Sequence, residues 1–422
     1  MFDRTQWVSV GMLIAVLLQL SQPITAAVPI GKTVQIAQTK SSDTGNKENG
    51  QFGRLYEKGT PEALESLRAG IAEYEKMLKQ AREAGNRSFE AIILHNIGEI
   101  YSALGEQQKA LEYYSQSVPL RRAVGHRDEE AITLNNIGDI YSELGEKQKA
   151  LESYNQSLSL TRALGNPGGQ ATSLYSIGNI YSELGENQKA LESYNQLLPL
   201  LRPLIRVVDA RLMEAVTLHN IGRVYQKLGE KQKALEHYNQ SLPLIRALGA
   251  RAEEATALNN IGNIYSELGE KQKALESYNQ SLILTRFVGD RRGEAFALHN
   301  IGDIYSNLGE KQKAVEYYSQ SLPVSRAVGD SEQEFKTLYN MAYAKYEQNN
   351  FTEALNDIEA SIKIIENLRT EIASPELRTS YFTILQNHYQ FYIYLLMHLH
   401  KTNPNSGYDI KASEASERAR NP

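Results

Sequence analysis

The amino-acid sequence predicts an all-α protein built as a solenoid of helix–turn–helix repeats. A segment reading NIGEIYSALGE begins at Asn96 and returns six times, at spacings of 40, 40, 44, 40, 40 and 40 residues. The counterparts of Asn96 are Asn136, Ser176, Asn220, Asn260, Asn300 and Asn340. A fixed period of this length is typical of proteins in which each repeat packs mainly on its neighbours.

Each repeat is predicted to contain two antiparallel helices. The first carries an apolar stripe at helical spacing, formed by Leu94, Ile97, Tyr101 and Leu104. The second carries another, formed by Ala110, Leu111, Tyr114 and Val118. Gly105 and Gly125 follow the two stripes, and glycine ends helices because it readily adopts a left-handed conformation.

Glycine also recurs inside the first helix, at Gly98, Gly138, Gly178, Gly222, Gly262 and Gly302. Each costs about 1 kcal/mol relative to alanine in a helix interior. We therefore expect a close helix–helix contact at these positions. Ala110 and its six counterparts are expected to provide the matching small surface on the second helix.

The N-terminal region is predicted to be a signal peptide over residues 1–27. Its apolar run, Val8–Leu20, has 13 residues, whereas a membrane span needs about 20. Thr25 and Ala27 are spaced as in a cleavage site, which predicts export to the periplasm or the extracellular space. An uncleaved membrane anchor, or no targeting role, is the alternative. Residues 28–50 are polar and are expected to form a flexible linker.

The repeat array is expected to begin with a degenerate capping repeat at 51–90, because Gly70 and Tyr74 align 40 residues before Ala110 and Tyr114. Seven repeats follow over 91–370, at about 91–130, 131–170, 171–214, 215–254, 255–294, 295–334 and 335–370. Four extra residues between Leu200 and Glu214 are predicted to lengthen the third repeat's second helix or its loop. Residues 371–422 are predicted to form C-terminal capping helices.

The repeated residues resemble the tetratricopeptide repeat family. Its pattern appears here as Ile97, Gly98, Tyr101, Ala110 and Tyr114, in a repeat of the length found in kinesin light chains. The family's usual tryptophan and terminal proline are replaced by Leu94 and Arg122 and their counterparts. The resemblance implies a right-handed superhelix, whose first helices line a concave groove that binds a protein or a peptide.

The segment 371–422 closely resembles the region that joins tetratricopeptide repeats to a caspase-like CHAT domain in bacterial proteins, including the sequence ASERAR at 415–420. We expect that domain to be missing from this chain. The chain contains no cysteine, so it cannot hold the Cys–His pair of the active members. Either the protein is naturally short, or its effector is truncated away or separately encoded. In the second case the chain is the sensor half of a protease-like regulator.

The resemblance places one recurring asparagine in the groove, at Asn96, Asn136, Asn220, Asn260, Asn300 and Asn340. Asparagine costs about 0.6 kcal/mol relative to alanine within a helix, so we expect an offsetting role. In the resembling repeats, such a ladder bonds the backbone of an extended peptide. Alternatively, each amide bonds a neighbouring helix and fixes the stacking.

Charged residues further define the expected groove, with basic Arg223 and Lys227 in the fourth repeat and acidic Asp139 and Asp303 elsewhere. This pattern would suit a mixed-charge peptide with an acidic residue near its middle. Ordinary solvated charges are the alternative.

Composition and motifs narrow the possible functions. The net charge of −5 and the pI near 6.0 argue against a dedicated nucleic-acid binder, and a carbohydrate-binding array has little support. His95, His219 and His299 share one repeat position but lie in different repeats, so no metal site is expected. The arginines near the ends of the second helices are expected to complement the helix dipole, or to bind an anion. We find no catalytic or nucleotide-binding motif. The sequence therefore predicts a non-catalytic interaction scaffold without a cofactor.

Overall fold

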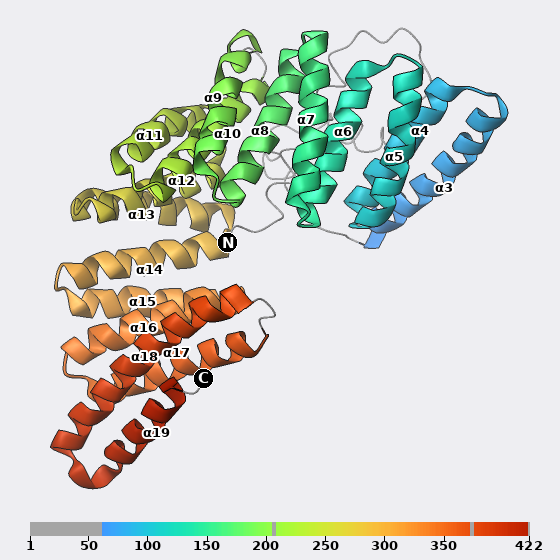
Figure 1. Ribbon diagram of the computed structural model, residues 1–422. Coiled ribbons are helices and arrows are strands. Elements are labelled where there is room, and N and C mark those ends of the chain that lie inside the picture. Colours follow the sequence, from blue (N-terminus) through green and yellow to red (C-terminus); the bar gives the residue numbers. More distant parts are fainter. Residues whose placement is uncertain (1–60, 205–207, 372–374, 421–422) are drawn as a thin grey trace. The chain divides into compact units, whose positions relative to one another are not determined.

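A computed structural model describes residues 61–204, 208–371 and 375–420, and every regular element in these ranges is a helix (Figure 1). The all-α prediction is confirmed. The predicted signal peptide, the linker and the first ten residues of the capping repeat lie outside the described residues. No helix in the described ranges is long and apolar enough to cross a membrane. The chain divides into two compact halves between Thr217 and Leu218, and each half is described by itself.

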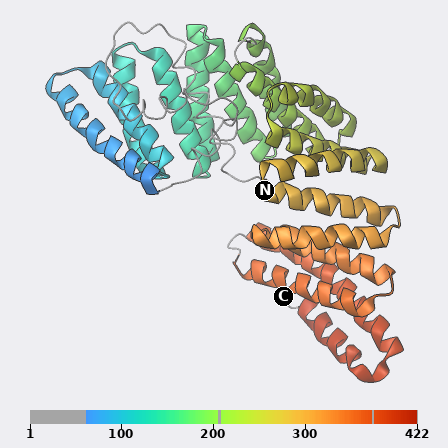
Figure 2. The same cartoon turned by 180° about the vertical axis from the view of Figure 1, so that it is seen from behind.

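The N-terminal half consists of antiparallel helices, each packed on the next along the chain (Figures 1 and 2). They are α3 (Pro61–Glu83), α4 (Arg87–Ala103), α5 (Gln107–Ala123), α6 (Arg127–Glu143), α7 (Lys147–Leu164), α8 (Pro167–Glu183) and α9 (Asn187–Leu201), followed by the 3₁₀ turn η2 (Arg202–Leu204). Helix α3 occupies the place of a second helix before the first complete repeat. The boundary between the halves falls within α10 (Val208–Lys227).

The C-terminal half continues the same alternation. Its helices are α11 (Lys231–Ala247), α12 (Arg251–Glu267), α13 (Lys271–Val288), α14 (Arg291–Asn307), α15 (Lys311–Ala327), α16 (Ser331–Glu347), α17 (Phe351–Glu371), α18 (Pro375–Thr402) and α19 (Tyr408–Arg420), with the 3₁₀ turn η3 (Pro404–Ser406) before the last. Helix α18 packs on α17 through an aromatic and aliphatic cluster that includes Tyr389, Leu395 and Leu396.

The four extra residues do not lengthen the third repeat's second helix, as one predicted alternative had it. That helix, α9, has 15 residues, whereas its counterparts α5 and α7 have 17 and 18. The extra length falls instead in the connection after α9, which was the other predicted alternative and includes η2, and in α10, which has 20 residues against 17 for the other first helices. Each first helix also begins about four residues before the predicted repeat boundary, as α4 does at Arg87.

The helical glycines make the predicted close contact, but the nearest atoms belong to a tyrosine ring, and among the predicted alanines only Ala234 comes close, with its backbone oxygen 3.2 Å from a Cβ placed on Gly222. A Cβ atom placed on Gly98 would lie 2.7 Å from the ring of Tyr114, and one on Gly138 would lie 2.5 Å from the ring of Tyr154. The other four helical glycines of the motif face the corresponding tyrosines in the same way. The absence of a side chain lets the tyrosine lie flat against the first helix.

A buried serine fixes the same pair of helices through the backbone. Ser117 Oγ donates to the carbonyl oxygen of Ala91 over 2.8 Å. The same bond, always across 26 residues, is made by Ser157, Ser281, Ser321 and Ser361. Because each serine is almost fully buried, this bond satisfies a hydroxyl that would otherwise be costly to bury.

The first helices form the inner layer of each half. Helices α6 and α8 contact one another directly, as do α12 with α14 and α14 with α16, whereas successive second helices lie further apart. The residues that face away from the second helices therefore share one surface within each half. We call it the first-helix face.

Equivalent positions of the two halves lie 124 residues apart over three repeats. The middle repeat of each set has a second helix of 18 residues, α7 or α13, that ends at a left-handed glycine, Gly165 or Gly289. The flanking second helices α5, α9, α11 and α15 all contain an internal proline. This correspondence lets one half serve as a comparison for the other.

Candidate functional site: the first-helix face

The recurring asparagines lie on the first-helix face, and most are half-buried between neighbouring repeats. They come from α4, α6, α10, α12, α14 and α16, and Asn220 of α10 is the one that is almost fully buried. Their position follows from the helical register, because the residue just before the buried isoleucine of the motif points partly toward the preceding repeat.

In the N-terminal half the amide nitrogens bond the preceding repeat. Asn96 Nδ2 donates to the Tyr74 hydroxyl over 3.5 Å, and Asn136 Nδ2 donates to the Tyr114 hydroxyl over 3.4 Å. The separation is 22 residues in both cases. Tyr74 of α3 thus accepts the same bond as the tyrosine of a complete repeat.

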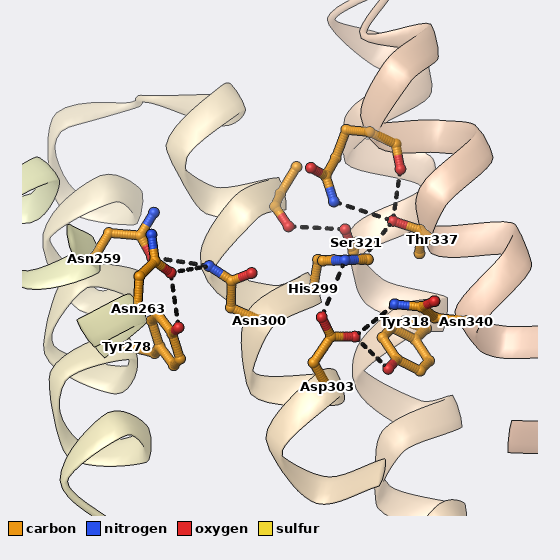
Figure 3. Close-up of polar contacts among 12 residues, drawn as sticks. Asn259, Asn263, Tyr278, His299, Asn300, Asp303, Tyr318, Ser321, Thr337 and Asn340 are labelled. Carbon is orange, nitrogen blue, oxygen red and sulfur yellow. Dashed lines mark hydrogen bonds and ion pairs between the residues drawn. The ribbon is translucent and has the colours of Figure 1, made fainter. Parts of the chain in front are cut away.

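In the C-terminal half the amides bond side chains of the preceding first helix (Figure 3). Asn300 Nδ2 donates to the amide oxygens of Asn259 and Asn263 over 3.2 and 3.3 Å. Asn340 Nδ2 donates to Asp303 Oδ1 over 2.8 Å. Asn260 Nδ2 lies 3.1 Å from His219 Nε2.

The acceptors in this network also receive a tyrosine hydroxyl. Tyr318 donates to Asp303 Oδ1 over 2.6 Å, and Tyr278 donates to Asn263 Oδ1 over 2.8 Å (Figure 3). One oxygen therefore joins a second helix of its own repeat to the first helix of the next repeat. In the N-terminal half, the corresponding bonds run from Tyr154 to Asp139 and from Tyr194 to Asn179.

The asparagine nitrogens therefore have the stacking role that the sequence left as an alternative. The amide oxygens differ: those of Asn96, Asn136, Asn260, Asn300 and Asn340 accept no hydrogen bond from any described residue. Each half thus presents asparagine oxygens whose orientation is fixed by the bond that the same amide donates. Such an oxygen can accept a hydrogen bond from a ligand N–H group.

The predicted acidic residues of the groove are structural acceptors as well. Burial raises the pKa of Asp139 to about 7, although the hydrogen bond from Tyr154 acts in the opposite direction. Asp303 accepts from two donors, and its other oxygen lies 3.4 Å from His299 Nε2. Burial thus lowers the fraction of Asp139 that is ionised near pH 7, whereas the oxygens of Asp303 face partners within the protein.

The predicted basic residues lie on α10. Arg223 is half-buried close to His219, and its charge adds to the effect of burial in lowering the pKa of that histidine to about 3. Lys227, one turn further along, is exposed. Of these two residues of the C-terminal half, only Lys227 is open to solvent.

The three histidines at this repeat position are buried, and burial favours their uncharged form. Burial lowers the pKa of His95, His219 and His299. His95 Nδ1 lies 3.1 Å from the Thr133 hydroxyl, and His299 Nδ1 makes the equivalent contact with Thr337 over 2.9 Å. No cluster of potential metal ligands occurs among the described residues.

The arginines near the ends of the second helices have specific partners. Arg122, Arg246, Arg286 and Arg326 each bond the glutamate eight residues later, at Glu130, Glu254, Glu294 and Glu334. Each pair joins the end of a second helix to the start of the next first helix. These four arginines thus have a carboxylate partner within the protein, so an external anion is not needed to explain why they recur.

The sequence reasoning missed the tyrosine hydroxyls and Asn259, and it did not foresee that Asn263 is an acceptor within the network. A signal was available, because an Asp or Asn recurs three residues after the ladder position at Asp139, Asn179, Asn263 and Asp303. The role of this recurring Asp or Asn could not be recognised from the sequence, because it depends on the hydroxyl of the second-helix tyrosine lying within hydrogen-bond distance of it.

These features define a helical-repeat protein in which a regular polar face is built by inter-repeat hydrogen bonds. Tetratricopeptide repeat models match residues 62–123, 89–163, 129–202, 213–286, 253–327 and 293–367, which together cover more than half of the chain. The chain belongs to the tetratricopeptide repeat family.

No curated protein matches the sequence. Among solved structures, a STAND signal transduction ATPase with a tetratricopeptide repeat sensor from Pyrococcus horikoshii is similar over 99% of this chain and 63% of its own, at 13% identity and a TM-score of 0.60. Aspartyl phosphate phosphatase F from Bacillus subtilis is similar over 85% of this chain and 92% of its own (12%, TM-score 0.53). The quorum sensor NprR from B. thuringiensis is similar over 86% and 99% (16%, TM-score 0.51). At these identities the similarity shows the fold.

Proposed function

We propose that this chain is a non-catalytic interaction scaffold that binds an extended protein segment on the first-helix face. The observation that carries the proposal is the set of asparagine oxygens that accept no hydrogen bond from described residues. A folded partner offers few backbone N–H groups, because its own secondary structure uses them. An extended segment offers one per residue, and these can pair with oxygens that are already oriented.

The chemistry of the face favours a ligand without a strong net charge. In the C-terminal half, Lys231 pairs with Glu267 and Lys311 pairs with Glu347, in each case across neighbouring repeats. The negative charges of Glu267 and Glu347 are thus partly neutralised. Exposed apolar groups remain beside the asparagines, such as Phe296 on α14, which is 38% exposed. A segment with apolar and uncharged polar residues fits this face best.

The test uses full-length protein and an array of random-sequence 12-residue peptides. The peptide that binds most tightly is then titrated against a variant with Asn260, Asn300 and Asn340 replaced by alanine. We expect its affinity to fall at least tenfold, because three ligand hydrogen bonds are lost at roughly 0.5–1.5 kcal/mol each.

A matched control separates binding from stacking. Tyr278→Phe removes a structural hydrogen bond to Asn263 but leaves the ladder oxygens in place. This variant should melt at a lower temperature and bind the peptide normally. If the asparagine variant melts lower but keeps its affinity, the ladder serves stacking alone and the proposed function is wrong.

A sensor role is the second candidate, since a sensor also needs a ligand-binding face. The neighbour from P. horikoshii is described as having a tetratricopeptide repeat sensor, and NprR as a quorum sensor. The effector would be a separately encoded caspase-like domain, as the resemblance of residues 371–422 implies. Co-purification of such a protein with the tagged chain from its source, lost on removal of residues 375–420, would support this candidate.

A further inference from the structure

The outer surface of α13 departs from that of every other second helix in the repeat array. Ile283 and Phe287 lie one turn apart, and both are 68% exposed, the highest values among the large apolar side chains of the described residues. The equivalent residues of α7 are Ser159 and Ala163. Two large apolar side chains so open to water are costly unless something covers them.

A cavity of about 470 Å³ lies beside this pair, between α13 and the start of the next repeat's second helix. Its floor includes Leu275 and Leu308, and Leu308 is 44% exposed. The cavity residues of α13 run from Gln272 to Gln280 on the same side of the helix as Ile283 and Phe287. The cavity and the apolar pair therefore form one stripe, which we call the α13 stripe.

Opposite charges mark the two ends of the α13 stripe. Glu276 lies at the cavity end, and its carboxylate takes part in no ion pair among the described residues. Arg251 lies at the other end, with its guanidinium carbon 4.1 Å from the centre of the Phe287 ring. Arg251 is exposed and likewise has no ion-pair partner in the described ranges.

The equivalent surface of the N-terminal half shows what is particular to α13. A cavity of about 750 Å³ occurs there at the same positions, lined by Leu151, Glu152 and Leu184. Helix α7, beside this cavity, carries Ser159 and Ala163 instead of the apolar pair. Arg127, the counterpart of Arg251, forms an ion pair with Glu130 over 2.8 Å. The cavity is thus a feature of the repeat, whereas the apolar pair is particular to α13, and an arginine without an ion-pair partner among the described residues is particular to the start of α12.

We propose that the α13 stripe docks an amphipathic helix of another protein. This site is centred on α13, with Leu308 after α14 at the cavity and Arg251 of α12 at the other end, and it is separate from the asparagines of the first-helix face. The partner helix carries a basic residue that faces Glu276, apolar residues that cover Ile283 and Phe287, and an acidic residue that faces Arg251. Eleven residues separate positions 276 and 287, which is about 16 Å along a helix. The basic and acidic residues of the partner are therefore about three turns apart, with the apolar residues between them.

The probe for this site is a fluorescein-labelled 17-residue helical peptide on an alanine and glutamine background. It has arginine at position 3, leucine at positions 7 and 10, and glutamate at position 14, so that all four lie on one face. Anisotropy titration of the full chain should give saturable binding of one peptide per chain, with a Kd below about 100 µM. A peptide with arginine and glutamate exchanged should bind at least tenfold more weakly.

The loss-of-site variant is Ile283→Ser with Phe287→Ala, which copies the residues of α7. We expect the Kd of the probe to rise at least tenfold, with an unchanged circular dichroism spectrum because both positions are exposed. Glu276→Gln should weaken binding less, about threefold. The variant with Asn260, Asn300 and Asn340 replaced by alanine should bind the probe normally, so failure here is distinguishable from failure of the proposed function.

The gain-of-site variant is Ser159→Ile with Ala163→Phe. It should raise the stoichiometry from one probe to two, the second bound more weakly because Arg127 is already paired. The proposal is overturned if the probe fails to bind, if the loss-of-site variant binds it equally well, or if the gain-of-site variant still binds one. Equal binding of the charge-exchanged peptide, or binding to phosphatidylcholine vesicles in place of the peptide, would also overturn it.

Discussion

The middle repeats of the two halves have the same packing but different polar chemistry. A Cβ placed on Gly138 would lie 2.5 Å from the Tyr154 ring, and one on Gly262 would lie 2.6 Å from the ring of Tyr278. Ser157 and its counterpart Ser281 bond their carbonyl acceptors over 2.8 Å in both halves. The contacts that fix the angle between the two helices of a repeat are thus reproduced almost unchanged.

The differences lie at positions that do not set this angle. Tyr154 bonds a carboxylate at Asp139, whereas Tyr278 bonds an amide at Asn263. The next repeat adds an asparagine to the network at Asn300, but only a serine at the equivalent Ser176. The comparison teaches that the glycine, tyrosine and serine positions define the architecture, while the remaining positions give each repeat its own surface.

The largest loss of stability is expected at the shared packing. Gly262→Ala should lower the free energy of unfolding by about 2–3 kcal/mol, since the new methyl group overlaps the buried Tyr278 ring, and this outweighs the gain of about 1 kcal/mol in helix propensity. Gly138→Ala should have the same effect. Urea unfolding followed by circular dichroism measures both. Gly70→Ala is the control, because its Cβ would have 3.5 Å to the nearest atom. Stability retained in Gly262→Ala would show that the tyrosine can move aside.

The second prediction concerns the shared acceptor of the C-terminal half. Asp303→Ala should cost about 2 kcal/mol, because it removes the acceptor of both Tyr318 and Asn340. Asp303→Asn should cost less than half as much, since Asn263 shows that an amide oxygen fills the same role. Thermal melts of the two variants test this ordering. Equal losses would mean that the charge, rather than the acceptor, matters.

The third prediction is that the free energy of unfolding depends on pH through Asp139 of the N-terminal half, whose counterpart in the C-terminal half is the uncharged Asn263. In the folded chain the pKa of Asp139 is raised from its ordinary value of 3.8 to about 7, so between these values the folded state holds a proton that the unfolded state releases. Asp139 therefore makes the free energy of unfolding fall as pH rises from about 4 to 7.

Asp139→Asn should remove this fall, on the order of 4 kcal/mol for a pKa that burial raises from 3.8 to about 7, and keep the bond from Tyr154. Denaturant midpoints at pH 5 and pH 8 measure it, with Asn263→Asp as the reciprocal variant that should introduce a similar dependence. An unchanged pH profile in Asp139→Asn would show that the carboxyl is ionised throughout this range.

The smallest effect is expected at the helix junctions. Glu294 accepts from Arg286 and Arg291, whereas the equivalent position of the N-terminal half is Gln170. Glu294→Gln should cost less than about 1 kcal/mol, because both arginines are about half exposed and water screens the pairs. A thermal melt at low and high salt checks it. A loss above about 2 kcal/mol would identify this junction as a structural requirement rather than a surface pair.

Much of the fold could be predicted from the sequence, because the same pattern recurs in each repeat and each occurrence supports the same assignment of helices and turns. The helical spacing of residues such as Leu94 and Ile97 and the turn glycines specified the helix pairs. The recurrence of Gly98 correctly indicated a close contact. The partner of that contact was assigned to Ala110 instead of Tyr114, since a periodic pattern does not show which of two buried residues lies nearer.

The candidate site was predictable only in its location. The helical register placed Asn300 and Asn340 on the surface of the first helices. It did not reveal that their nitrogens bond Asn263 and Asp303 of the preceding repeat, because residues 37 positions apart become neighbours only after the repeats stack. Asp303, which the sequence suggested as a charge in the groove, is therefore an acceptor that links neighbouring repeats.

The sequence by itself determined the repeat and its helix pairs, because period, apolar spacing and glycine positions are local properties of the chain. The tertiary structure alone decided how the side chains of neighbouring repeats combine. It oriented the asparagine oxygens, neutralised the histidines by burial and left Ile283 and Phe287 exposed. These outcomes depend on distances between separate repeats, which are set by the stacking of helices and not by position along the chain.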